Sequence, residues 1–337
     1  MTGLKIIPVF LSQEGCPGQC VYCLREVVGA GQSVMRRTPK EEVEAACALF
    51  FAQGIQRADE IAFYGGTFTS LPANRQEAFL DAAVKQRQRG FIQRIRLSTR
   101  PDAIDQETCE RLAFYGVDLV ELGVQSFDET VLLASGRNYE PQCVERSMKL
   151  LQQAGIDVAF QLMLGLPGQT WQSVLQTATE TLRLHPVGVR IYPLLVFEGT
   201  ELYGQWRDGV YKPLPLATAV AQASYWRRLF LNDGIPVFRI GLQLGEAELQ
   251  KVAAGPWHPS FSALAAAHDC RAVLDCHLRN LSVDGCRHEL IMHQTSLAIA
   301  LQQDKKRLAH LVDNYSAINI KITKNITVND NIDLAVN

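Results

Sequence analysis

Short apolar runs rich in β-branched residues alternate with amphipathic stretches through the first three-quarters of the chain. Such runs predict β-strands, and the stretches between them have the spacing of helices with one apolar face. The expected strands lie at about residues 5–10, 60–64, 92–98, 118–124, 157–164 and 187–193, with a seventh at about 235–242. Strands and helices that alternate at this spacing predict βαβ units and a parallel sheet.

Local signals mark the ends of several of these helices. Thr38 and Glu41 flank Pro39 as a capping box with proline at the first helical position, which predicts a helix start. Gly116 and Gly155 stand where helices should stop, directly before the next expected strands.

The predicted architecture is an α/β fold in the form of a partial barrel. Six strand–helix units are too few to close an eight-stranded TIM barrel, so we expect an open, TIM-like (β/α)6 barrel. Reactive groups in such folds gather at the carboxyl ends of the strands. Polar, glycine-rich segments stand at these ends, at residues 65–67, 98–100, 123–126 and 165–168.

The strand–helix rhythm weakens after about residue 244. We therefore predict a core over residues 1–244 and an appended region over 245–337, which would cover the mouth or the edge of the barrel. Residues 317–328 alternate isoleucine with polar side chains, as an edge strand or a hairpin would.

Composition and charge narrow the function classes. Of the 337 residues, 47% are apolar and 20% are charged, which suits a chain that buries a full core. Lys and Arg total 33, and Asp and Glu total 35. This balance argues against nucleic-acid binding over the whole surface, but a local basic groove that binds nucleic acid stays possible. No apolar run approaches the ~18 residues of a membrane span, and the N-terminus has the pattern of a strand rather than of a signal peptide, so we expect a cytoplasmic protein that does not act at a membrane.

The cysteines carry the strongest chemical signal. Nine cysteines at irregular spacing do not suit a disulfide framework. Cys16, Cys20 and Cys23 crowd into eight residues, and thiolates in one loop can converge on zinc or on an iron–sulfur cluster. A structural zinc needs a fourth ligand, but the next cysteine, Cys47, lies on an apolar helix face, where core packing is expected. Three protein ligands leave one coordination position open, which is typical of a catalytic metal site, while a zinc site completed by a distant residue stays as the alternative.

The spacing C-x3-C-x2-C, with aromatic Tyr22 before the last cysteine and a strand before the loop, resembles the radical S-adenosylmethionine (SAM) enzymes. The resemblance implies that Cys16, Cys20 and Cys23 hold a [4Fe-4S] cluster, whose fourth iron binds the amino and carboxylate groups of SAM. It also implies that an electron from a flavodoxin- or ferredoxin-type donor cleaves SAM to methionine and a 5′-deoxyadenosyl radical, which abstracts hydrogen from a substrate.

Two further segments match the methionine side of the family's cofactor site. Gly65, Gly66 and Thr67 match the glycine motif whose backbone approaches the methionine amino group, and Tyr22 is also expected to contact the cofactor. Arg137 matches an arginine that pairs with the SAM carboxylate, as a guanidinium fork can. A solvated surface arginine is the alternative for Arg137.

The ribose side is implied by Ser98 and Arg100, at the end of the third strand, where similar enzymes place polar side chains against ribose and the methionine carboxylate. A plain turn opened by Pro101 is the alternative there. Gln125 and Ser126 would face the barrel mouth near the ribose.

The adenine side is implied by Gly165 and Leu166, which resemble the family's adenine-side loop. Gln161 stands where relatives often have an acidic ribose ligand, so it is expected at the cofactor with a changed hydrogen-bonding pattern.

The narrower resemblance is to the radical SAM core of the Elongator catalytic subunit, over roughly residues 5–242. It is carried by residues 63–72, 98–102, 121–126 and 190–203. The oxygen-independent coproporphyrinogen oxidases are a more distant match. Elongator-type proteins also have a basic N-terminal extension for tRNA and a C-terminal acetyltransferase domain, and the 15 residues before Cys16 and the residues after 245 are not expected to form either. We therefore expect a small-molecule or nucleobase substrate rather than intact tRNA, with a tRNA-binding subunit of an Elongator-like assembly as the alternative.

Three residues are candidates for contact with the substrate. Arg190 and Tyr192 lie on the last strand of the expected core, and His258 lies between two prolines in a loop that would close the barrel mouth. A packed or surface histidine is the alternative for His258. The cysteines and histidines at residues 268–288 could bind a second metal ion. No cysteine pair there has Cys-x2-Cys spacing, however, so we expect these residues to occupy ordinary core and surface positions.

Overall fold

The fold is built on one curled parallel sheet. The computed structural model describes residues 4–11, 14–16, 20–23 and 37–268, together with the backbone of three strands nearer the C-terminus. The sheet has the strand order β1-β2-β3-β4-β5-β6-β8, and every neighbouring pair in it is parallel. Its strands are β1 (Ile6–Phe10), β2 (Glu60–Tyr64), β3 (Arg94–Thr99), β4 (Leu119–Gln125), β5 (Asp157–Leu164), β6 (Val189–Pro193) and β8 (Val237–Ile240). The predicted α/β partial barrel is confirmed, including its seventh strand.

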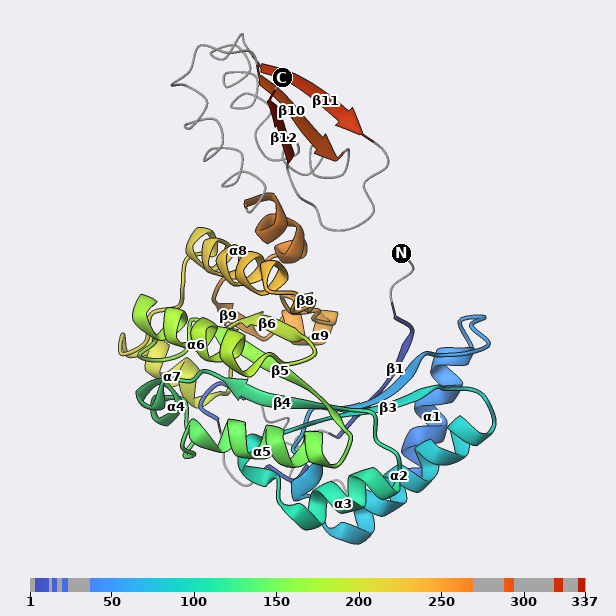
Figure 1. Cartoon of the computed structure of the whole chain (residues 1–337). Coiled ribbons are helices and arrows are strands. Elements are labelled where there is room, and N and C mark those ends of the chain that lie inside the picture. The colour runs from blue at the N-terminus through green and yellow to red at the C-terminus, as the bar shows by residue number, and fades with distance from the viewer. Residues whose placement is uncertain are drawn as a thin grey trace.

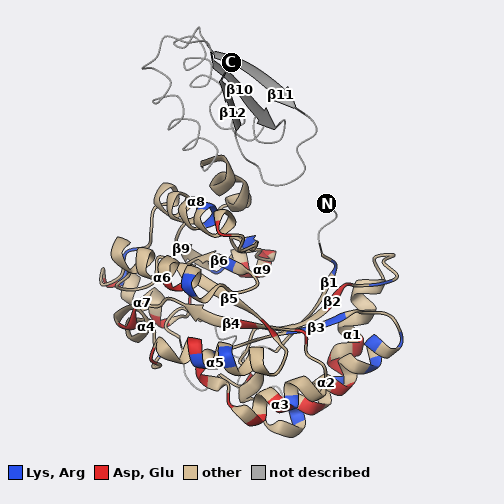
Figure 2. Cartoon of the chain, in the orientation of Figure 1, with Lys and Arg blue, Asp and Glu red and all other residues tan. Residues whose placement is uncertain are grey.

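Helices cover the outer side of this curled sheet, as Figure 1 shows. The covering helices are α1 (Pro39–Phe51), α2 (Ala73–Gln88), α3 (Gln106–Phe114), α5 (Gln142–Gln153), α6 (Trp171–Leu184) and α8 (Leu216–Asn232). The shorter helices are α4 (Glu129–Ala134), α7 (Glu201–Arg207) and α9 (Glu246–Leu249), and the 3-10 turns are η1 (Phe68–Ser70) and η2 (Pro101–Ala103). Acidic and basic segments alternate along α2, α3 and α5 in Figure 2, in keeping with the near balance of charge in the whole chain.

The predicted helix ends are confirmed by their local geometry. The Thr38 hydroxyl accepts a hydrogen bond from the Glu41 N–H, and the Glu41 carboxylate accepts one from the Thr38 N–H. Gly116 and Gly155 have φ of +64° and +76°, in the left-handed region where glycine ends a helix without strain. Strand β3 begins at Arg94 rather than at the expected residue 92, because Ile92 is buried in the loop that leads to it.

The two faces of the sheet differ in chemistry, because side chains alternate along a strand. The outward side chains are apolar and buried under the helices; they include Phe63, Leu97, Val120, Phe160 and Ile191. The inward side chains are polar; they include Glu60, Arg96, Glu121, Gln161 and Arg190. The apolar face holds the sheet to its helices, and the polar face is available for a site.

The chain beyond residue 244 contributes to the core as well. β9 (Val252–Ala254) pairs antiparallel with β7 (Val196–Phe197), and Phe261 and Ala265 are buried in the main apolar cluster. The predicted domain boundary at 244 stays a prediction.

The strand expected within 317–328 is found as β11 (Ile318–Thr323), at the edge of a small sheet with β10 (His288–His293) and β12 (Asp333–Val336). Among the described residues, no helix combines the length and apolarity needed to cross a membrane.

The apolar face generates a stability prediction. Phe160 on the central strand β5 is fully buried, so Phe160→Ala should lower the free energy of unfolding by about 3–5 kcal/mol through lost burial and a residual cavity. Phe114 is 83% exposed, and Phe114→Ala should change it by no more than about 0.5 kcal/mol. Denaturant unfolding measures both variants, and equal effects would contradict the assignment of the outward face as the core.

Candidate functional site

The cysteine loop is attached to the glycine turn that follows β2. The Leu11 N–H donates to the Tyr64 carbonyl at 2.8 Å, and the Thr67 N–H donates to the Glu14 carbonyl at 3.0 Å. Gly15 has φ of +75°, and a Cβ there would collide with the Thr67 carbonyl oxygen. Only glycine at this position lets the two loops approach so closely.

The thiols of the cysteine loop have identified neighbours. Cys16 Sγ is 3.3 Å from the Thr67 hydroxyl, and Cys20 and Cys23 share a hydrogen bond. That bond, with help from the positive charge of Arg137, lowers the pKa of Cys20 to about 5 against the effect of burial. The same bond, together with burial, raises the pKa of Cys23. The pocket therefore stabilises a thiolate at Cys20 first.

Arg137 is directed at this thiolate from inside the fold. Its side chain is nearly buried, so the alternative of a solvated surface arginine is wrong. Nη1 donates to Cys20 Sγ at 3.4 Å, Nη2 donates to the Gly123 carbonyl, and the guanidinium lies 5.2 Å from the centre of the Tyr139 ring. Its Nε is buried without a partner, so a donor remains for a bound group.

Gln125 ends β4 in a strained conformation next to Arg137. Its φ is +64°, a left-handed value that is uncommon outside glycine and that tends to occur at functional sites. Its Oε1 is buried without a hydrogen-bond partner. A Cβ at Gly123 would lie 3.1 Å from Gln125 Nε2 and 3.6 Å from Arg137 Nη2, so the glycine leaves room for both side chains.

Ser126 points to the other side of the sheet. Its hydroxyl lies 3.3 Å from that of Thr177 on α6 and accepts the Asp128 N–H at 3.1 Å. The structure therefore does not bring Ser126 together with the thiols, and its expected role near ribose stays a prediction.

The end of β3 forms the turn at Pro101 that the sequence offered as the alternative, and the expected cofactor contacts of Ser98 and Arg100 stay predictions. Arg100 donates twice to the Asp102 carboxylate across the turn that begins at Pro101, at 2.8 and 2.7 Å. Its guanidinium also lies 5.6 Å from the Tyr139 ring, which Arg137 contacts as well. Arg100 and Arg137 thus converge on one aromatic ring, whereas Ser98 lies deeper, where it accepts a hydrogen bond from Gln161.

The loop after β5 packs against the cysteine loop. Gly165 has φ of +83°, and its carbonyl accepts the Tyr211 hydroxyl at 2.7 Å. Leu166 is buried in the same apolar cluster as Val21, and Tyr22 packs against that cluster. The expected adenine-side loop and the expected metal loop are therefore neighbours in space.

A network of buried charges lies on the inner face of the sheet, and the sequence analysis named only one of its members, Arg190, as a candidate site residue. Arg96 pairs with Glu60 at 2.6 Å and with Glu121 at 2.8 Å. Arg190 pairs with the same Glu121 at 3.0 Å, and all four side chains are at most 9% exposed. The sequence signal for this network is a charged residue between apolar neighbours within an expected strand. Because side chains alternate along a strand, that pattern places the charged side chain on the face opposite the core.

Arg190 and Tyr192 lie on this inner face, and their expected contact with a substrate stays a prediction. Arg190 donates to the Tyr192 hydroxyl at 3.2 Å and to the Tyr64 hydroxyl at 2.8 Å, and its guanidinium lies 5.1 Å from the Tyr64 ring. His258 has a local contact instead: its Nδ1 accepts the Ser260 N–H at 3.0 Å. The structure brings Arg190 and Tyr192 together, and the expected role of His258 stays a prediction.

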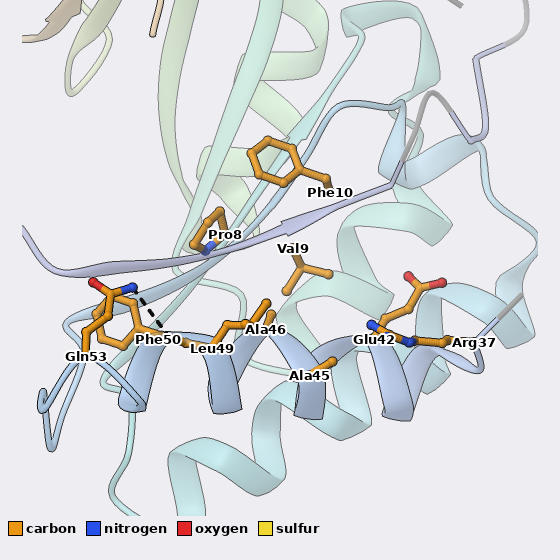
Figure 3. A pocket seen from close by; sticks show the side chains of 10 residues that line it. All are labelled: Pro8, Val9, Phe10, Arg37, Glu42, Ala45, Ala46, Leu49, Phe50 and Gln53. Carbon is orange, nitrogen blue, oxygen red and sulfur yellow. Dashed lines mark hydrogen bonds between the residues drawn. The ribbon is translucent and has the colours of Figure 1, made fainter. Parts of the chain in front are cut away.

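A separate groove runs between the edge strand β1 and helix α1. Figure 3 shows Val9 of β1 directed toward α1, where Ala46, Leu49 and Phe50 lie, while the Phe10 ring lies on the other side of the strand. It contains none of the site residues expected from the sequence.

The choice between an iron–sulfur cluster and zinc at the cysteine loop stays a prediction at this point. Within the described ranges, no three Cys, His, Asp or Glu side chains are grouped as ligands of one metal ion. Cys47 is buried in the main core, as expected, and most of the cysteines and histidines considered for a second metal lie outside the described residues.

Comparison with known proteins identifies the family. The model described as the radical SAM superfamily matches residues 10–180, just over half of the chain. The chain belongs to the radical SAM superfamily. A model of the radical SAM C-terminal domain matches residues 186–270.

Relatives of this radical SAM enzyme include Elongator proteins. A tRNA uridine(34) acetyltransferase of Methanocaldococcus jannaschii is 28% identical over 67% of this chain and 49% of its own length. Elongator complex protein 3 of Homo sapiens is 27% identical over 71% of this chain and 47% of its own length. An uncharacterized protein of Methanocaldococcus jannaschii is 29% identical over 59% of this chain and 64% of its own length. The chain thus has an Elongator-like core and spans about half to two thirds of each relative.

Solved structures share the fold. The archaeal Elp3 of Methanocaldococcus infernus with an N-terminal deletion has a TM-score of 0.62 at 20% identity, covering 85% of this chain and 65% of that chain. Coproporphyrinogen III oxidase from Escherichia coli has a TM-score of 0.51 at 18% identity, and the match covers 69% of this chain and 54% of the oxidase. Both resemblances named from the sequence are confirmed, and the family implies binding of a [4Fe-4S] cluster and SAM.

The close approach of Gly15 to Thr67 generates a prediction. Gly15→Ala should reduce the iron bound after anaerobic reconstitution by more than half, because the added methyl group pushes the cysteine loop off the glycine turn. Gly54→Ala is the matched control: φ there is +81°, so it has the same backbone penalty of about 1–2 kcal/mol, but nothing lies within 4 Å of the new Cβ. Iron analysis that finds equal loading in both variants would contradict the contact's role.

Proposed function

We propose that this chain binds a [4Fe-4S] cluster through Cys16, Cys20 and Cys23 and cleaves SAM reductively. When bound, the cluster would supply the electron that breaks SAM into methionine and a 5′-deoxyadenosyl radical, which removes a hydrogen atom from the substrate. The observation that supports the proposal is the hydrogen bond from the buried Arg137 guanidinium to Cys20 Sγ, in the loop whose Cys16 contacts the glycine turn through Thr67.

The residues around the thiols suit a bound group with both charge and hydrogen-bonding capacity. The Arg137 guanidinium compensates the negative charge that thiolates bring into a buried site. The Tyr22 hydroxyl, Gln125 Oε1 and Arg137 Nε are buried without partners, and such groups cost free energy unless a ligand satisfies them. We assign Gly65, Gly66 and Thr67 to the methionine end of SAM, because their turn contacts the cysteine loop.

The substrate would lie against the inner face of the sheet, near Tyr64, Arg190 and Tyr192. The charges there are balanced, because the two arginines of the network face two glutamates. A neutral cluster favours an uncharged polar substrate over a strongly anionic one. We infer a nucleobase or another small polar molecule, and a flavodoxin- or ferredoxin-type protein as the electron donor.

A second candidate function is action on tRNA, within an Elongator-like assembly. It is supported by the similarity of this chain to a tRNA uridine(34) acetyltransferase. In this case the nucleobase would be presented as part of an RNA chain. Sequencing of RNA that copurifies with the anaerobically isolated protein distinguishes the two: enrichment of tRNA supports this candidate, and its absence favours a free small molecule.

Anaerobic reconstitution tests the proposed chemistry. The native protein should bind about four irons per chain, show a reduced-cluster electron paramagnetic signal that SAM changes, and release 5′-deoxyadenosine on reduction. Cys20→Ala should abolish the 5′-deoxyadenosine, because the cluster loses one of its three ligands. Cys47→Ala removes a core thiol away from the loop and should retain both iron and product. A native protein that takes up zinc and yields no 5′-deoxyadenosine would refute the proposal.

A further inference from the structure

Glu121 holds the side chain of Gln161 in one orientation. Gln161 Nε2 donates to Glu121 Oε2 at 2.8 Å and to the Ser98 hydroxyl at 3.1 Å. A carboxylate only accepts hydrogen bonds, so the amide nitrogen of Gln161, not its oxygen, must face Glu121. With both N–H groups used in this way, the carbonyl Oε1 is the part of the amide left for another group.

The carboxylate that imposes this orientation is itself firmly held. Glu121 is fully buried, and its Oε1 accepts from Arg96 at 2.8 Å and lies 3.0 Å from Arg190 Nη2. Two guanidinium groups thus hold one of its oxygens and fix the plane of the carboxylate. The orientation of Gln161 therefore depends on contacts from three neighbouring strands.

We propose that Glu121 is a positioning residue that makes Gln161 an obligatory hydrogen-bond acceptor toward the bound cofactor. This inference rests on the proposed function, because the group that faces Gln161 Oε1 would be a hydroxyl of the SAM ribose. An acidic side chain at this position would accept the same hydrogen bond, but here it would face the Glu121 carboxylate. Glutamine with its nitrogen turned to Glu121 offers the same acceptor without a second negative charge.

The chain provides a matched control for the positioning role. Glu60 is as buried as Glu121 and pairs with the same Arg96, at 2.6 Å, but its recorded partners are Arg94 and Arg96 rather than Gln161. Glu60→Gln and Glu121→Gln therefore both weaken the charge network, and only Glu121→Gln releases the Gln161 amide.

The test measures the dissociation constant for SAM on the reconstituted protein, with thermal unfolding of the cofactor-free protein alongside. Glu121→Gln should weaken SAM binding about tenfold, whereas Glu60→Gln should change it less than twofold while lowering thermal stability to a similar extent. Gln161→Glu should also weaken SAM binding at neutral pH, because two carboxylates would then lie at hydrogen-bond distance.

The double variant Glu121→Gln/Gln161→Glu gives the decisive measurement. In the double variant the amide of residue 121 donates to the carboxylate of residue 161, so one amide again faces one carboxylate. SAM affinity should therefore recover to within about threefold of the native value. Native affinity in Glu121→Gln, equal weakening in Glu60→Gln, or a double variant no better than the single ones would each overturn the inference. A native protein that binds no SAM would instead refute the proposed function, and the positioning role with it.

Discussion

The structure depends on how charge is accommodated inside a curled sheet. Glu121 is fully buried at the centre of β4, where an unpaired carboxylate would cost several kcal/mol. Arg96 from β3, Gln161 from β5 and Arg190 from β6 provide its partners. Because these side chains meet only if β3, β4, β5 and β6 follow in this order, parallel and in register, the pairing favours this arrangement of the sheet over its alternatives.

The same inner face leads directly to the cofactor site. Gln161 connects Glu121 to Ser98 near the end of β3, and Arg190 connects it to Tyr64, which stands beside the glycine turn. The turn in turn contacts the cysteine loop through Gly15. An apolar outer face that fixes the helices and a polar inner face that carries the chemistry thus arise from one alternation of side chains along each strand.

The site itself combines a strained backbone with unsatisfied polar atoms. Gln125 is held at a positive φ, and Arg137 Nε and the Tyr22 hydroxyl are buried without partners. Such features cost stability in a protein without its ligand and are common where a ligand must be bound. Their concentration around the three thiols distinguishes this end of the barrel from the groove beside β1, whose walls are mainly apolar.

Much of the fold was determined by patterns local in the sequence. The strand positions followed from apolar runs, the helix ends at Gly116 and Gly155 from single residues, and the family from the spacing of cysteines within eight positions. What only the tertiary structure decided are contacts across long separations, such as Arg137 on Cys20, 117 positions apart, and Gln161 on Glu121, 40 positions apart. Such contacts depend on the register between strands and on the direction in which each loop leaves its strand. Gln125 and Ser126 are consecutive residues, yet Gln125 lies at the site and Ser126 faces α6. Local composition determines which elements form, whereas the side chains that meet at their ends are set by packing of the whole sheet.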